Sequence, residues 1–123
     1  MMLWEARGRR KSQASVAKQR TGLNCAAYVE EMTSSGVSAT VSTVLYDELA
    51  NYCAKGVRPN PDDGIFGFYL IYSDELEDLI PALFGPLGLP LPSATDSEIV
   101  PHLENARHLA VFLQIKVDAL SHA

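Results

Sequence analysis

The amino-acid sequence predicts a small all-α protein, an antiparallel bundle of about four helices. Apolar residues recur three and four positions apart through most of the chain, which is the spacing of one helix face. Clusters of proline, glycine and polar residues separate these stretches, as turns do. The 123 residues correspond to a single domain, and 47% hydrophobic with 20% charged residues is a globular composition. We therefore expect one domain over residues 21–123, preceded by a flexible basic arm over residues 1–20.

Two helices are predicted in the first half of the domain. Residues 23–32 have a short helical pattern, and Asn24 is placed to cap it. A second helix over residues 38–55 follows from apolar positions spaced by four, three and one. Gly56 then stands where a glycine commonly ends a helix.

A third helix is predicted from the segment at 60–63 (NPDD), which supplies a cap, a proline in the first turn and two acidic residues. Apolar residues then keep one helical face from 65 to 83. Pro81 is expected to kink or end this helix.

A proline-rich connection over residues 85–94 leads to the last predicted helix, over residues 95–120 and bent near Pro101. Thr95 and Glu98 have the spacing of a capping box at its start. Apolar residues then follow a seven-residue repeat, formed by Ile99, Leu103, Ala106, Ala110, Leu113, Val117 and Leu120.

Two segments also fit strands. Residues 65–72 (IFGFYLIY) are rich in strand-forming types, and a new helix could then begin at Ser73. Residues 109–117 alternate apolar and other residues as a strand does. Because a lone strand lacks hydrogen-bonding partners, the two strands would form together and give an α+β fold instead.

The formal net charge of −5 conceals an uneven distribution. Residues 1–20 hold six basic residues and one acidic residue, a net +5, whereas residues 21–123 hold four basic and fourteen acidic residues, a net −10. An acidic body attracts basic proteins and repels nucleic acid. The arm is the only part suited to contact nucleic acid, through Arg7, Arg9, Arg10 and Lys11. Its arginine-rich, acid-poor composition also suits a mitochondrial targeting peptide.

The sequence shows no catalytic or cofactor-binding pattern. It contains no nucleophile motif, no phosphate-binding loop and no convergent set of three metal ligands, so neither a cofactor nor a metal is expected. Cys25 and Cys53 lie 28 positions apart among apolar residues and are expected to be buried free thiols in a cytoplasmic protein. The longest uncharged stretch, residues 79–95, contains four prolines, so no membrane span is expected.

The sequence therefore favours a small, non-catalytic cytoplasmic protein that acts through protein–protein contacts, as a regulator, adaptor or immunity-type inhibitor does. An acidic cluster would attract a basic protein and consists of Asp74, Glu75, Glu77 and Asp78. An apolar stripe on the last helix would meet a second subunit in a homo-oligomer and includes Leu103, Ala106, Ala110, Leu113 and Val117.

Two further hypotheses belong to other functional classes. A small apolar ligand could bind, or react, in a pocket lined by tyrosines, namely Tyr46, Tyr52, Tyr69 and Tyr72. A nucleic acid could bind the basic arm, and that affinity would fall steeply with salt. A cavity with convergent polar groups would favour ligand binding, whereas a solid core around the tyrosines would count against it.

Overall fold

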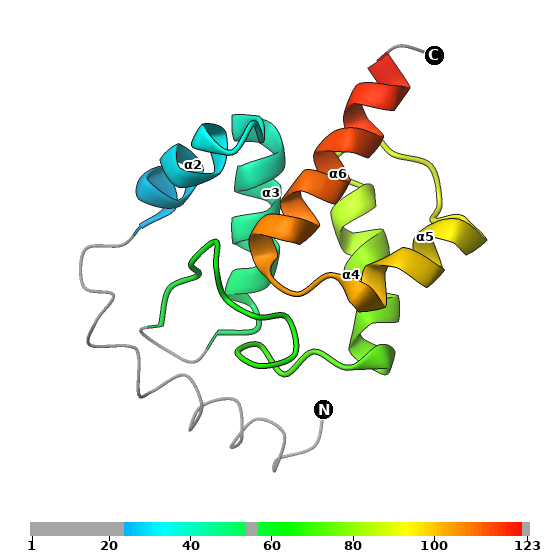
Figure 1. Cartoon of the computed structure of the whole chain (residues 1–123), viewed down its shortest axis with the longest axis horizontal. Coiled ribbons are helices and arrows are strands. Elements are labelled where there is room, and N and C mark those ends of the chain that lie inside the picture. The colour runs from blue at the N-terminus through cyan, green and yellow to red at the C-terminus, as the bar shows by residue number, and fades with distance from the viewer. Residues whose placement is uncertain (1–23, 54–56, 122–123) are drawn as a thin grey trace.

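A computed structural model describes residues 24–53 and 57–121 of the chain (Figure 1). The helices in these ranges are α2 (Cys25–Ser34), α3 (Ala39–Ala50), α4 (Ser73–Phe84), α5 (Ala94–Ile99), the short 3₁₀ helix η2 (Val100–His102) and α6 (Ala106–Ser121). The described residues contain no β-strand, so the predicted all-α bundle is confirmed. The alternative with strands at 65–72 and 109–117 is wrong, because residues 109–117 lie in α6 and residues 65–72 lie mostly in turns.

α2 and α3 form a helical hairpin whose ends match local sequence signals. The Asn24 side chain accepts a hydrogen bond from the Ala27 amide at 2.9 Å, as predicted for the cap of α2. Gly36 adopts a φ of 86° in the turn between the helices, where a residue with a side chain is strained. α3 ends at Ala50, earlier than the predicted residue 55, because the next amides bond carbonyls only three residues back. Gly56 lies outside the described residues.

Residues 57–72 form an irregular segment, so the predicted helix start at residues 60–63 is wrong. This segment pairs with the chain that precedes α6, where the Ile65 amide donates to the Glu104 carbonyl at 3.0 Å. Such long-range hydrogen bonds use backbone groups that a helix would need within itself. Two glycines in the segment further lower its helical propensity.

α4 begins at Ser73, the alternative start that the sequence offered. It continues to Phe84, so of the two effects predicted for Pro81, a kink or an end of the helix, the end is wrong. A proline inside a helix costs about 3 kcal/mol. Leu79 and Leu83 are fully buried on either side of Pro81, and their burial in the core offsets this cost.

The last predicted helix is divided into three parts rather than bent. α5 ends at Ile99, η2 follows with Pro101 inside it, and Leu103 is extended with a ψ of 124°. Pro101 has no amide hydrogen to continue the α-helical ladder. α6 begins as a separate helix at Ala106. The Asn105 side chain directly before it accepts a hydrogen bond from the His108 amide at 2.9 Å.

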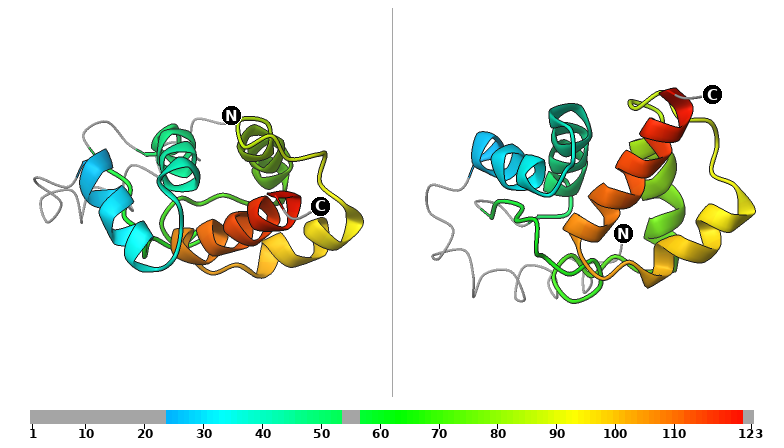
Figure 2. Two further views of the ribbon diagram at one scale, coloured as in Figure 1. Left: turned by 90° about the horizontal axis from the view of Figure 1, so that it is seen from above. Right: turned by 45° about the horizontal axis from the view of Figure 1, so that its top comes forward.

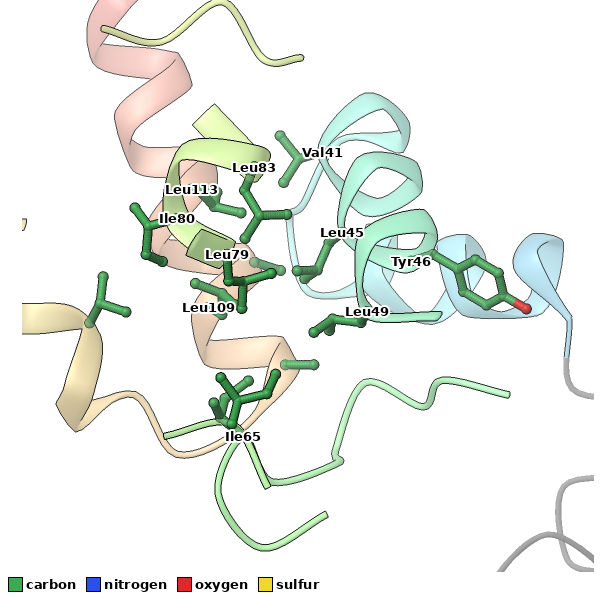
Figure 3. Close-up of a cluster of buried hydrophobic side chains, with 14 of the residues drawn as sticks. Val41, Leu45, Tyr46, Leu49, Ile65, Leu79, Ile80, Leu83, Leu109 and Leu113 are labelled. Carbon is green, nitrogen blue, oxygen red and sulfur yellow. The ribbon is translucent and has the colours of Figure 1, made fainter. Parts of the chain in front are cut away.

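The core lies where α3, α4 and α6 meet (Figure 3). Each of these helices contributes two fully buried leucines, which are Leu45 and Leu49, Leu79 and Leu83, and Leu109 and Leu113. Each buried leucine side chain contributes about 1.5–3 kcal/mol to folding. α2 covers α3 at one end of the molecule, and α5 lies at the opposite end (Figures 1 and 2). No helix in the described ranges has the length and apolar character that crossing a membrane requires.

Candidate functional site

A partly open cleft of about 350 Å³ lies between α4 and α5. Most of its lining is apolar and comes from Phe66, Leu76, Ile80, Pro81, Pro92, Val100 and Pro101. Glu77, Asp96 and Ser97 supply the polar groups of its wall. The volume falls at the lower end of the range of ligand pockets, so the cleft suits a few apolar side chains or one small molecule.

The α5 wall of the cleft is fixed by Asp96. Its carboxylate accepts a hydrogen bond from the Ser93 amide at 3.0 Å, and the Ser93 hydroxyl accepts one from the Asp96 amide at 3.1 Å. This is the capping box of α5, so the predicted box of Thr95 with Glu98 is wrong by two residues at its start. A box needs its acidic residue three positions after the cap, and both pairs meet that spacing.

Lys116 of α6 holds Asp96 from the other side. Its ammonium nitrogen lies 3.0 Å from the second carboxylate oxygen of Asp96, whose side chain is 5% exposed. Burial alone would raise the pKa of Asp96, but the hydrogen bonds from Ser93 and Lys116 outweigh it and lower that pKa. Asp96 is therefore charged at neutral pH, and its ion pair with Lys116 ties α5 to α6.

Exposed apolar side chains adjoin the cleft. The Phe66 ring, which lines it, stacks on Tyr72 with ring centroids 6.2 Å apart, and Tyr72 is 55% exposed. Leu91 is 86% exposed and directly precedes the lining residue Pro92. Exposed apolar side chains thus stack on, or directly precede in sequence, residues that line the cleft.

The described part of the chain, which contains the cleft, is strongly acidic. The described residues include fourteen acidic side chains and three basic ones. Arg107 pairs with Glu31 and Asp62 at 3.5 and 3.0 Å, and Lys116 pairs with Asp96 at 3.0 Å. Glu77 lines the cleft from α4. The acidic cluster on this helix therefore presents negative charge beside an apolar cavity.

Of the predicted acidic cluster, Glu77 alone lines this cleft. Asp74, Glu77 and Asp78 are exposed on α4, and Glu75 is half-buried. The lining residues Phe66, Ile80, Pro92 and Val100 were not predicted. The sequence signal that could have indicated this wall is the pair of prolines at 92 and 101. Because proline interrupts a helix, this pair marks the chain between them as a separate short helix.

The four predicted pocket tyrosines are dispersed. Tyr46 and Tyr69 are buried, Tyr52 is half-buried and Tyr72 is exposed. The Tyr46 ring packs edge-on against Tyr28, with ring centroids 5.1 Å apart. None of the four predicted tyrosines lines the α4–α5 cleft, so the structure does not bring them together there.

Two buried tyrosines instead belong to a polar part of the core. The Tyr69 hydroxyl donates to the Asp63 carboxylate at 3.2 Å, and the same oxygen accepts the Asn60 amide at 2.9 Å. The Tyr28 hydroxyl is fully buried and has no hydrogen-bond partner in the described part of the chain. Burial, reinforced by the negative charge of Asp63, raises the pKa of both phenols, so both stay neutral.

The predicted oligomer stripe is largely inside the bundle. Ala106, Ala110 and Leu113 are buried in the core, and Leu103 and Val117 are half-buried. The large apolar residues most exposed toward the middle of α6 are instead Val111 and Ile115, at 37% and 62%. The homo-oligomer itself stays a prediction.

The remaining predicted features are placed as follows. The arm cations Arg7, Arg9, Arg10 and Lys11 lie outside the described residues. Cys25 and Cys53 are not joined in a disulfide, and both are half-buried rather than buried as predicted. Among the described residues no group of three or more histidine, cysteine or acidic side chains is arranged to hold a metal ion.

Comparisons of this chain with protein-family models, with curated proteins and with solved structures give no match.

Proposed function

We propose that this protein acts by binding, and that its α4–α5 cleft receives a cationic segment of another protein through two or three apolar side chains. The observation that carries the proposal is the apolar cleft bordered by the acidic cluster of α4. An amphipathic helix laid into an apolar groove is a common mode of peptide recognition, and its anchors lie three and four residues apart.

The apolar lining supplies the affinity in this proposal. Each Å² of apolar surface removed from water contributes about 25 cal/mol. Val100 and Ile80 form part of a wall that is already ordered by the core, since both are buried and pack against the main cluster. A pre-ordered wall lowers the entropy cost of binding.

The acidic cluster supplies selectivity for positive charge. Glu77 lines the cleft, and Asp74 and Asp78 are exposed on the same helix. Charges at the edge of an interface mainly steer association and reject partners of like charge. We therefore expect binding that weakens as salt increases.

The test titrates the full chain into a dye-labelled amphipathic peptide of leucine and lysine, followed by fluorescence anisotropy. Two matched peptides separate the contributions: one replaces every lysine by glutamate, and the other replaces every leucine by serine. The proposal expects saturable binding of the leucine–lysine peptide alone. Equal binding of the leucine–glutamate peptide would overturn it.

Variants of exposed residues locate the binding. Ser97→Arg fills the cleft and repels cations, and we expect about tenfold weaker binding, as for loss of a well-packed anchor. Glu77→Lys reverses one charge of the wall. Thr43→Arg on α3 and Glu30→Lys on α2 are matched controls, since both residues are exposed on helices that do not line the cleft. Equal weakening by the controls would contradict binding in the cleft.

The same variants also test the alternative that the cleft binds a small apolar ligand. The volume of the cleft also suits one small apolar molecule. A neutral apolar dye that binds the wild-type chain but not Ser97→Arg, with no peptide binding, would replace the proposal by ligand binding.

A further inference from the structure

We infer that the chain carries its own occupant for the α4–α5 cleft: residues 1–11, which dock in cis and compete with an external partner. This inference rests on the proposed function, because it assigns to the same cleft an internal ligand of the same chemistry. The cis occupant would insert the apolar side chains of residues 1–4 and place the following cations beside the acidic cluster of α4.

The composition of residues 1–11 matches what the cleft selects. Residues 1–4 (MMLW) are all apolar and include Trp4, the single tryptophan of the chain. Four cations follow within seven positions, namely Arg7, Arg9, Arg10 and Lys11. Tryptophan and arginine are among the residue types enriched at the positions that dominate binding energy at interfaces.

Charge complementarity favours this occupant. Residues 1–20 carry a net +5, whereas the described residues include fourteen acidic and three basic side chains. Lys116 and Arg107 are committed to ion pairs with Asp96 and with Glu31 and Asp62. The acidic excess of the body therefore has its largest source of compensating charge within the chain in residues 1–20.

The connecting chain is long enough for docking in cis. Trp4 lies twenty positions before Asn24, where the described part begins, and this length of chain spans up to about 65 Å when extended. A domain of this size has a radius of gyration of about 13 Å, so a path around half its surface is roughly 50 Å. The segment can therefore reach the cleft even though α5 lies at the end of the molecule opposite α2 (Figure 2).

Covalent linkage makes weak intrinsic affinity sufficient. A ligand tethered by a short linker has an effective concentration in the millimolar range, so a segment with a millimolar dissociation constant occupies the cleft about half of the time. The apparent affinity for an external peptide then falls by the fraction of open clefts. An external partner therefore has to bind the cleft tightly enough to displace residues 1–11.

Trp4 reports on this docking directly, because no other tryptophan contributes to the emission of the full chain. We expect the Trp4 emission of the wild-type chain to be blue-shifted. Acrylamide quenching of Trp4 should increase roughly twofold in Ser97→Arg, because this variant loses the docked state that about half of the wild-type molecules occupy. Thr43→Arg should leave both readouts unchanged. Equal quenching in wild type and Ser97→Arg would overturn the inference.

The second measurement uses the leucine–lysine peptide and keeps the two proposals separable. Replacing Leu3 and Trp4 together by serine should tighten peptide binding about two- to tenfold, because it frees the cleft. Val16→Ser, in the connecting chain outside residues 1–11, is the matched control. If peptide binding is present but unchanged by the double substitution, the cis occupant is refuted and the binding function stands. If no peptide binds even to the double variant, the binding function is refuted as well.

Dilution distinguishes docking in cis from docking into a second copy. Intramolecular docking predicts Trp4 emission that is independent of protein concentration. A red shift on dilution would contradict docking in cis and assign the segment to the cleft of a neighbouring molecule.

Discussion

Lys116 of α6 and Asp96 of α5 form an ion pair 3.0 Å long at the back of the cleft. The two residues come from helices separated in sequence by the 3₁₀ helix and the extended residues before α6. Asp96 also closes the capping box of α5 with Ser93. One carboxylate therefore fixes both the start of α5 and its position relative to the core.

Removal of this carboxylate should loosen α5 and lower stability. Asp96→Ala removes a cap and leaves Lys116 without its partner, and we expect a loss of about 1–2 kcal/mol in the free energy of unfolding. Urea denaturation followed by circular dichroism measures it. Asp118→Ala, at an exposed acid that bonds Gln114 on the same helix as Lys116, should cost less than about 0.5 kcal/mol. Equal losses would contradict the special role of Asp96.

The same carboxylate gives a pH dependence of defined sign. Because the folded-state pKa of Asp96 is lowered, its contribution is fully present above the unfolded-state pKa of about 3.9 and is lost as the pH falls through the folded value. The stability difference between wild type and Asp96→Asn should therefore be constant from pH 7 to about pH 5 and shrink below about pH 4. A difference that grows on acidification would show that the ion pair does not stabilise the fold.

Two buried tyrosines should respond oppositely to loss of their hydroxyl groups. Tyr69→Phe removes the hydrogen bond to Asp63 and should cost about 1 kcal/mol. Tyr28→Phe removes a buried hydroxyl that has no partner in the described part of the chain, so it should be neutral or stabilising by up to about 1 kcal/mol. Thermal denaturation of the two variants provides the comparison. A larger loss for Tyr28→Phe than for Tyr69→Phe would contradict this assignment.

The homo-oligomer predicted from the sequence can now be tested on the residues that α6 exposes. Ile115 and Val111 are the candidates, since Ala110 and Leu113 are used by the core. Oligomerisation predicts a mass above 13.4 kDa by light scattering at tens of micromolar, and a return to monomer in Ile115→Asp. A monomer mass for the wild-type chain would refute the oligomer.

The sequence predicted the helices whose signals are local. Asn24 caps α2 where expected, because a cap needs only amides two or three residues away. Residues 65–72 were misassigned because their partners are distant: the Ile65 amide bonds Glu104, and no spacing within the segment reveals this pairing. Pro81 likewise looked like a helix end, yet burial of the leucines around it outweighs the proline cost.

Of the candidate site, the sequence predicts the acidic residues of α4 but not the apolar cleft. Glu77 and its neighbours are adjacent in sequence, so a local count finds them. The apolar cleft depends instead on the orientation of α5, and that orientation is set by Asp96 and Lys116, twenty positions apart. Phe66 and Val100 become neighbours of one cavity only after this tertiary contact forms.

A nitrogen–proton NMR titration of the full chain with the leucine–lysine peptide decides whether the cleft is the binding site. We predict saturable shifts concentrated on amides of α4 and α5, including Glu77, Ile80 and Ser97, and absent from Glu30 and Thr43. Shifts centred on α2 and α3, or small shifts spread evenly over all acidic positions, would contradict binding in the cleft.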